Sequence, residues 1–311
     1  MPGGARRAIL AWLDRPDGAE LHADDICRVV ALGHARRRQS WLPRLCSEPT
    51  ATRPDHAIRS PLLRIIDAHA HLGWDFTFDH DFPKEHLVDE LGNLGVDTLI
   101  VQPGTTHDVE TARAQHDAIA RLASEYPGRV FGMANPSPHL RPSEYEAEVT
   151  RCVRELGFVA VKMHPLAHAV APDLAPGRLV VAVASKLGIP VMVHTGSGIP
   201  FALPSAVVPV ARRNPDTKIV LAHSGGPMFA GEALLAAELC PNIYLEASWV
   251  SYDRVSSFCQ SIGARRVMMG ADHAANVPVE LAKFRSASLS DEDLEWCLGK
   301  TAAGFFGLPT W

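Results

Sequence analysis

The sequence lacks the features that mark several broad classes of protein. No apolar stretch in its 311 residues approaches the ~20 residues of a membrane-spanning helix, so we do not expect a membrane protein. The formal net charge is −5, which argues against nucleic-acid binding because that function needs a basic face. The six cysteines show no C-x-x-C spacing, which favours reduced thiols in a cytoplasmic protein over a disulfide framework or a cysteine zinc site.

The first 60 residues differ from the rest of the chain. They contain no lysine, and Glu20–Gln39 has the apolar stripe of a helix that ends in three arginines. Ser47–Pro61 is rich in proline, serine and threonine, which predicts a connector. We therefore expect residues 1–60 to form an N-terminal helical extension and connector, a candidate homodimer contact, ahead of a main domain over residues 61–311.

The main domain alternates apolar runs with helical patterns. The runs are rich in β-branched residues and begin near residues 65, 98, 130, 158, 190, 218, 243 and 267. The intervals between them are helical, as in Ser143–Leu156, where Ser143 and Glu146 have the spacing of a capping box. Eight buried strands alternating with helices predict an α/β fold of the (β/α)8 TIM-barrel class, with a doubly wound open sheet as the alternative.

Two histidines follow the first apolar run, in the sequence Ile-Ile-Asp-Ala-His-Ala-His-Leu-Gly. His69 and His71 are two positions apart, so on a strand both rings point to one face. Neutral imidazole is a common ligand of zinc and similar ions, and two converging rings could bind one. The same spacing also arises by chance or in hydrogen-bonded core residues, so the pair alone leaves both interpretations open.

Polar residues also follow the other runs. In a barrel, the carboxyl ends of all eight strands meet around one mouth, so residues at those ends share one site. The ends carry Asp67, Lys162, His164, His194, His223, Glu246, Ser248 and Asp272. Histidine at four separate ends and aspartate at another predict a metal site. His273 follows Asp272 directly and is expected on the other face of its strand, so it is left out.

The motifs at these ends, taken together and in order, resemble those of the amidohydrolase superfamily. They are Asp-Ala-His-Ala-His, Val-Lys-Met-His-Pro, Val-His-Thr-Gly, Leu-Ala-His-Ser-Gly-Gly, Tyr-Leu-Glu-Ala-Ser and Gly-Ala-Asp-His, within Ile65–Leu308. More narrowly, the chain resembles the amidohydrolase-related group that includes aminocarboxymuconate semialdehyde decarboxylase, resorcylate-type decarboxylases, and several lactonases and hydrolases.

That resemblance implies one divalent ion held by His69, His71, His194 and Asp272. Zinc is expected first from the ligand types, with manganese or iron as alternatives. The same resemblance makes His223 the general acid or base, and Asp272 both a ligand and an acceptor for the proton of a metal-activated water. Asp67 is expected to orient a ligand from behind, while Glu246 and Ser248 stay open between rim structure and substrate contact.

The resemblance leaves two roles for Lys162. In some superfamily members this strand supplies a carbamylated lysine that bridges two ions, and His223 would then bind the second ion with His194. The Lys-x-His-Pro pattern resembles members with one ion, in which an unmodified Lys162 would bind a substrate carboxylate. We adopt the second role. His164 is expected to reach the substrate, with a hydrogen bond inside the rim as its alternative.

Three functions follow from these predictions. The first is a metal-dependent hydrolase that cleaves a C–N or C–O bond in a small amide, lactone or ester. The second is a non-oxidative metal-dependent decarboxylase of an unsaturated or aromatic carboxylic acid, in which the site polarises the substrate and supplies a proton. The third is a metal-binding regulatory or scaffold protein on a barrel that has lost catalysis, which the full ligand set disfavours.

Overall fold

The computed structural model describes residues 64–308. The chain divides between Ile58 and Arg59 into two units, and residues 64–308 belong to the second. The helix expected over Glu20–Gln39 and the rest of the predicted extension lie outside the described residues. Within residues 64–308, no helix combines the length and the apolar character that crossing a membrane requires.

The described part of the chain builds one sheet of nine strands, in the order β2-β1-β3-β4-β5-β6-β7-β8-β9. Only β2 runs antiparallel to its neighbour in this sheet, and every other pair is parallel. The strands are β1 (Ile66–Asp75), β2 (His80–Phe82), β3 (Thr98–Pro103), β4 (Val130–Ala134), β5 (Ala160–Met163), β6 (Val191–His194), β7 (Ile219–Ala222), β8 (Ile243–Glu246) and β9 (Val267–Met268).

The sheet curls until β1 lies beside the segment that follows β9. The Ala68 N–H donates to the Met269 carbonyl at 3.2 Å, and the Asp272 N–H donates to the His69 carbonyl at 2.7 Å. These bonds join β1 to the segment at and after β9, as expected when a parallel sheet closes. The predicted runs all coincide with parallel strands, so the fold is TIM-barrel-like, as expected from the sequence.

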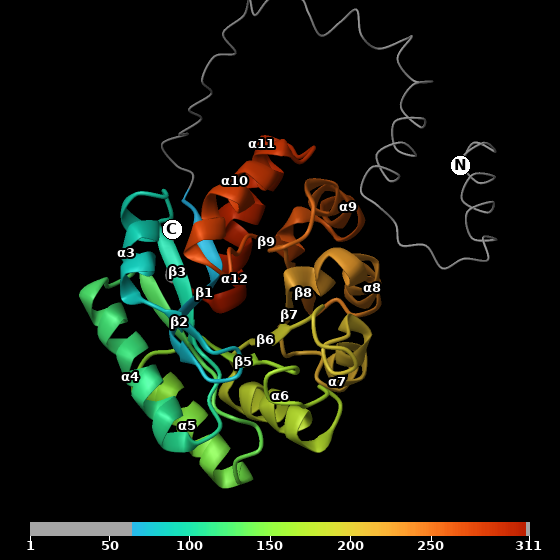
Figure 1. The fold of residues 1–311 in the computed structure, drawn as a ribbon. Helices are drawn as coiled ribbons and strands as arrows, with labels where there is room; N and C mark the ends of the chain where they lie inside the picture. The colour runs from blue at the N-terminus through green and yellow to red at the C-terminus, as the bar shows by residue number, and fades with distance from the viewer. Residues whose placement is uncertain (1–63, 309–311) are drawn as a thin grey trace, which may run out of the picture. The chain divides into compact units, whose positions relative to one another are not determined.

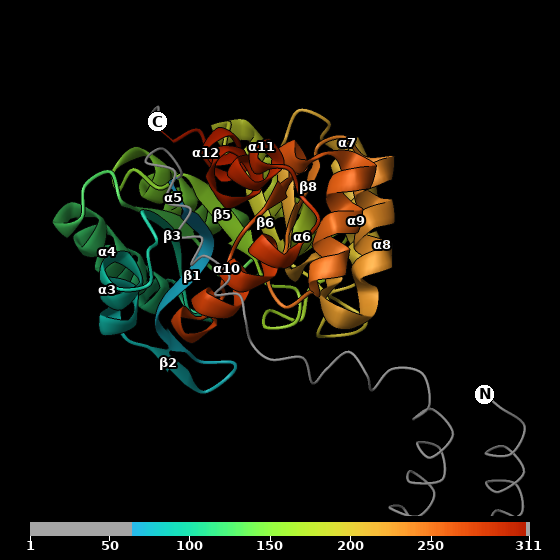
Figure 2. The ribbon, with the colours of Figure 1, turned by 90° about the horizontal axis from the view of Figure 1, so that it is seen from above.

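Helices surround the strands (Figure 1), and the view from above places the β1–β2 ribbon at one edge of the molecule (Figure 2). The α-helices are α3 (Lys84–Gly92), α4 (Val109–Glu125), α5 (Pro142–Arg154), α6 (Ala175–Leu187), α7 (Val208–Arg213), α8 (Gly226–Leu239), α9 (Tyr252–Ile262), α10 (Val277–Ser286), α11 (Asp291–Glu295) and α12 (Thr301–Phe306). Short 3-10 turns are η2 (Pro204–Val207), η3 (His223–Gly225), η4 (Ala264–Arg266) and η5 (Ala274–Asn276), and η6 (Trp296–Lys300) is a π turn.

The predicted capping box on α5 is wrong. The helix begins at Pro142, and its N-cap, Arg141, makes no side-chain capping bond. Proline suits the first turn because its missing N–H would have no partner there, so Ser143 lies one residue inside the helix. Glu146 instead pairs with Lys186 of α6.

A bulge in β1 decides which of its side chains face the barrel interior. Ile66 and Ala68 belong to the interior cluster, which α12 closes at one end with Phe305 and Phe306. The pairing of β1 with β3 shifts between residues 67 and 70, and an extra residue in one strand reverses the alternation of faces. The two histidines that follow therefore face inward, after inward-facing Ala68.

Candidate metal centre

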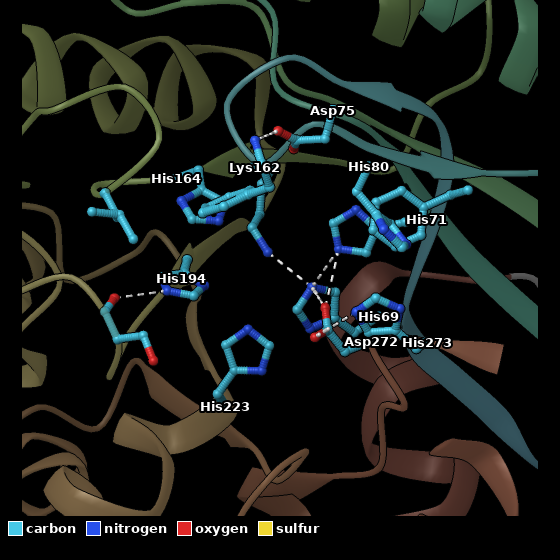
Figure 3. Close-up of a pocket in the computed structure, with 14 residues that line it drawn as sticks. His69, His71, Asp75, His80, Lys162, His164, His194, His223, Asp272 and His273 are labelled. Atoms are coloured by element: carbon cyan, nitrogen blue, oxygen red, sulfur yellow. Dashed lines mark hydrogen bonds and ion pairs between the residues drawn. The ribbon is translucent and has the colours of Figure 1, made fainter. Parts of the chain in front are cut away.

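Three of the predicted ligands meet at the carboxyl end of the strands. His69 Nε2 lies 3.3 Å from His71 Nε2, and Asp272 Oδ1 lies 3.5 Å from the first atom and 3.2 Å from the second. Figure 3 shows these side chains converging. Ligands that bind one ion at ~2.0–2.2 Å are about 3.0–3.6 Å apart, so this donor set fits a divalent ion. The prediction that His69 and His71 share one face is confirmed.

Asp272 lies in a loop and not on a strand. β9 ends at Met268, and the backbone of Asp272 is left-handed, with φ of 68°. The expectation that His273 faces away from the site is wrong, because side chains alternate only along a strand. Asp272 and His273 both line the cavity beside the ligand group.

Trp249 binds the second oxygen of Asp272. Its indole N–H donates to Asp272 Oδ2 at 2.8 Å, and its backbone N–H donates to Glu280 Oε1 at 3.2 Å. Burial by itself would raise the pKa of Asp272, but the nearby imidazoles, His223 first, stabilise the carboxylate and hold that pKa well below its usual range. Asp272 therefore presents one free oxygen, Oδ1, to the ligand group.

Glu246, at the end of β8, orients His69. Its Oε2 accepts from His69 Nδ1 at 2.9 Å, from the His223 backbone N–H at 3.0 Å and from the Ser248 hydroxyl at 3.0 Å. An ionised carboxylate only accepts, so the hydrogen of His69 lies on Nδ1 and the Nε2 lone pair faces the other ligands. Glu246 thus holds a ligand in place, a role that the sequence left open.

The close approach of Glu246 and His69 requires a glycine on the neighbouring segment. A Cβ atom at Gly270 would lie 2.7 Å from Glu246 Oε1 and 2.8 Å from His69 Cβ. Both distances are shorter than real Cβ contacts allow, so any side chain there would push the pair apart. The glycine of the Gly-Ala-Asp-His motif is therefore part of the site.

His223 offers its Nε2 atom to the cavity. Its Nδ1 lies 2.7 Å from Ser248 Oγ, whose own hydrogen goes to Glu246. The hydroxyl therefore accepts from Nδ1–H, which leaves the Nε2 of the neutral ring with the lone pair. Burial lowers the pKa of His223, and the carboxylates of Asp272 and Glu246 partly oppose that shift.

His164 and His194 form another wall of the cavity, with stacked rings whose centres are 4.0 Å apart. His194 Nε2 lies 3.0 Å from the Ser197 carbonyl, which only accepts, so the lone pair of His194 is on Nδ1. His164 Nδ1 accepts the Ala167 N–H at 3.2 Å, so its Nε2 carries the hydrogen. Neither ring joins the three-atom group, and the ligand role of His194 stays a prediction.

Lys162 reaches the edge of the ligand group. Its Nζ lies 3.0 Å from His69 Nε2, and the residue is 2% exposed. Burial lowers the pKa of Lys162 to about 8, so the amine still carries its charge for the most part at pH 7. This position suits a lysine that binds a substrate carboxylate next to the ion.

Asp67 lies apart from this group. Its Oδ1 accepts the backbone N–H groups of His69 and Ala271, both at 2.9 Å, and so ties β1 to the loop that carries Asp272. Glu90 of α3 lies close enough to interact with this carboxyl, and burial raises the pKa of Asp67 to about 7 and that of Glu90 to about 10. Asp67 therefore supports the backbone, and the predicted orienting of a ligand ring falls to Glu246.

A cavity of about 340 Å³ opens beside the ligand group, large enough for one small ring compound. Phe82 stacks on His71 with ring centres 4.6 Å apart, and Phe78 lies 5.4 Å from His164. The lining residues are His69, His71, Asp75, Phe78, His80, Phe82, Lys162, His164, Leu166, His194, Ser197, His223, Asp272 and His273. Sequence reasoning missed His80 and Phe82, because β2 is only three residues long and gives no periodic signal.

The family model described as Amidohydrolase matches residues 66–308. The chain therefore belongs to the amidohydrolase family and is a metal-dependent enzyme of the amidohydrolase superfamily. No curated protein matches the sequence.

Several solved structures share the fold at low sequence identity. A dihydroxybenzoic acid decarboxylase from a Polaromonas species is 19% identical, with 80% of this chain and 98% of that chain covered and a TM-score of 0.65. A 5-carboxyvanillate decarboxylase from Novosphingobium aromaticivorans is 16% identical, with coverage of 80% and 97% and a TM-score of 0.66. An uncharacterised TIM-barrel protein from Bordetella bronchiseptica is 18% identical, with coverage of 79% and 99% and a TM-score of 0.63.

Proposed function

We propose that this protein is a metal-dependent, non-oxidative decarboxylase of a small aromatic or unsaturated carboxylic acid. The observation that carries the proposal is the buried Lys162 amine at the edge of the ligand group, inside a cavity with aromatic walls. A lysine ammonium binds a carboxylate, and the rings of Phe78 and Phe82 suit the flat face of an unsaturated compound. The cavity thus offers one place for an acid group and one for a ring.

The solved structures support this choice over hydrolysis. The Polaromonas decarboxylase contains manganese and the inhibitor 2-nitroresorcinol. The Novosphingobium decarboxylase contains manganese and 4-hydroxy-3-methoxy-5-nitrobenzoic acid. By this likeness we expect one divalent ion and a substituted benzoic acid, with manganese ahead of the zinc predicted from ligand types. A homodimer and a cytoplasmic location stay predictions.

The ion would be held by the four predicted ligands, and it would polarise a substrate oxygen when bound. These ligands are His69 through Nε2, His71 through Nε2, His194 through Nδ1 and Asp272 through Oδ1. Lys162 would bind the substrate carboxylate, and the Nε2–H of His164 would donate to a substrate oxygen. Glu246, Ser197 and Ala167 fix the tautomers of His69, His194 and His164, respectively. The other nitrogen of each ring is thereby left for the role proposed here.

His223 would supply the proton that replaces the carboxylate in this reaction. The bond between the carboxylate and its carbon breaks, the electron pair stays on that carbon, and carbon dioxide leaves. A proton then replaces the lost group, so the acid anion and one proton give the unsaturated product and carbon dioxide. With Nδ1–H held by Ser248, the lone pair on His223 Nε2 would take up a proton from solvent and then deliver it to that carbon.

Hydrolysis of an amide, lactone or ester is the second candidate, because the same ligand group could serve it and the chain belongs to the amidohydrolase family. Such a reaction needs a base for the attacking water. Asp272 is poorly placed as a base, since Trp249 occupies Oδ2 and Oδ1 faces the ligand group. Only His223 would then be left to take the proton of the attacking water, which makes decarboxylation the better-supported function.

The test uses manganese-loaded protein and hydroxybenzoates labelled with ¹³C in the carboxylate, among them 2,6-dihydroxybenzoate, in D₂O. We expect release of labelled carbon dioxide and one deuterium on the carbon that lost it, with His223→Asn strongly impaired. A parallel panel of esters, lactones and amides in H₂¹⁸O measures hydrolysis. Incorporation of ¹⁸O there, without carbon dioxide release from any acid, would overturn the proposal.

A further inference from the structure

Gln102, which the sequence analysis did not single out, lies next to the ligand group. It is the last residue but one of β3 and stands opposite His71 in the register of β1 and β3. Its Nε2 atom is 2.8 Å from His71 Nε2, and the residue is wholly buried. Among the described residues, its Oε1 atom and His71 Nδ1 have no hydrogen-bond partner.

This arrangement cannot persist once His71 binds an ion. The lone pair on His71 Nε2 either accepts the amide hydrogen or binds the metal, and it cannot do both. With the ion bound, an amide N–H aimed at that nitrogen loses its acceptor. A buried donor without a partner costs about 1–3 kcal/mol, whereas the reversed amide would aim an oxygen at this position, where it could bind the ion. Oxygen and nitrogen of a glutamine amide occupy nearly the same space, so reversal needs no other movement.

After reversal, the free Oε1 atom lies where the Nε2 atom is now. That position is 2.8 Å from one ligand atom, which is the separation of two adjacent ligands around an ion with ~2.0–2.1 Å bonds and six-coordinate geometry. The geometry points to Gln102 Oε1 as a further ligand of the ion. This inference rests on the metal centre of the proposed function, and it does not depend on the reaction.

A neutral amide oxygen also bears on the choice of metal. Structural and catalytic zinc sites are mostly four-coordinate, with nitrogen and sulfur donors prominent, whereas carbonyl and carboxylate oxygens suit manganese, magnesium and calcium. With Gln102, the site would have five protein ligands and would favour an ion of higher coordination number. Gln102 would thus select manganese over zinc.

The experiment compares Gln102→Met, which keeps the length but removes the oxygen, with Gln102→Glu, which keeps an oxygen. Binding of Mn²⁺ is followed by the electron paramagnetic resonance signal of the free ion, and coordination number by the visible absorption of the Co²⁺-loaded protein. We expect Gln102→Met to bind Mn²⁺ at least tenfold more weakly, with stronger Co²⁺ absorption from lower coordination. Gln102→Glu should bind Mn²⁺ at least as tightly as the unchanged protein.

Gln115→Met is the matched control, because Gln115 donates to the Trp74 carbonyl away from the ligand group. It should leave both readouts unchanged. Gln102→Met with Mn²⁺ affinity within twofold of the unchanged protein and an unaltered Co²⁺ spectrum would overturn the inference. If that variant fails to fold, weaker Mn²⁺ binding by folded Gln102→Glu would do the same. Failure of the decarboxylase assay alongside the expected metal-binding changes would overturn the proposed reaction and leave this ligand standing.

Discussion

Replacing Glu246 with glutamine tests how the barrel prepares His69 for an ion. The carboxylate receives three hydrogen bonds at Oε2 and the Ser248 backbone N–H at Oε1, the last at 2.6 Å. A glutamine must place its NH₂ group against the donors on one side. His69 Nδ1–H would then lose its acceptor or share a weaker one, and the ring would be free to rotate or change tautomer.

The expected loss can be estimated from these contacts. Removing a partner that orients a metal-binding histidine typically weakens metal affinity by about 10–100-fold, which corresponds to roughly 1.4–2.7 kcal/mol. The folding stability should fall as well, by about 1.5–3 kcal/mol for each hydrogen bond to a charged group that is lost. We expect a Mn²⁺ dissociation constant raised 10–100-fold in Glu246→Gln, measured by competition with a chelator at a temperature where the variant is folded.

Glu148→Gln is the matched control for this experiment. Glu148 is also a wholly buried glutamate that binds a buried histidine, His116 Nδ1 at 2.8 Å, but it belongs to α5 and its partner to α4, away from the ligand group. Arg113 and Arg151 neutralise it. Its replacement should lower stability without changing Mn²⁺ affinity. Equal metal affinity in Glu246→Gln and the unchanged protein would refute the reasoning, as would equal losses of affinity in both variants.

Three further predictions follow from the described contacts. Trp249→Phe removes the N–H that holds Asp272 Oδ2 and should weaken Mn²⁺ binding about tenfold. Trp74→Phe, which changes another exposed tryptophan, is the control and should leave Mn²⁺ binding unchanged. Equal Mn²⁺ affinity in the two variants would contradict the role of the Trp249 N–H. Lys162→Met should raise the KM for a benzoate at least tenfold. It should leave Mn²⁺ binding equal or tighter, because a positive charge beside the ion is lost. An unchanged KM would refute the role of Lys162 in binding the substrate carboxylate. Burial lowers the pKa of His168 to about 4, below its usual value of 6.5. The contribution of the neutral ring to stability is therefore full above pH 6.5. As the pH falls towards 4, the free energy of unfolding should decrease by about 3 kcal/mol. His168→Phe should remove that part of the acid sensitivity, seen as a smaller drop in the urea midpoint between pH 7 and pH 4.5; an equal drop would contradict it.

The buried carboxylates around the site divide into two kinds. Glu246 is surrounded by donors, and it fixes the ring hydrogen of His69 directly and that of His223 through Ser248. Asp67 of β1 and Glu90 of α3 have pKa values raised by burial, so near neutral pH the pair holds a proton, and Asp67 ties β1 to the loop that carries Asp272. The chemistry of the site therefore depends on the first group, and its shape depends on the second.

The order of strands and the identity of seven of the fourteen cavity residues could be predicted from the sequence, because both depend on local patterns. Apolar β-branched runs form buried strands, and parallel strands in a barrel bring their carboxyl ends to one mouth. Those two rules suffice to bring His69, His71, His164, His194 and His223 together with Lys162 and Asp272.

Other features were decided only by the tertiary structure, because they depend on contacts between distant segments. The β1 bulge sets which residues face inward, and it is defined by pairing with β3. The Asp272 loop turns both its own side chain and His273 into the cavity through a left-handed residue that no alternation rule predicts. Glu246 binds His69 across 177 residues of sequence, and Gln102 reaches His71 only because β1 and β3 are neighbours. The sequence by itself determined which donors gather at the mouth, and the packed barrel decided which atom of each donor is free to bind.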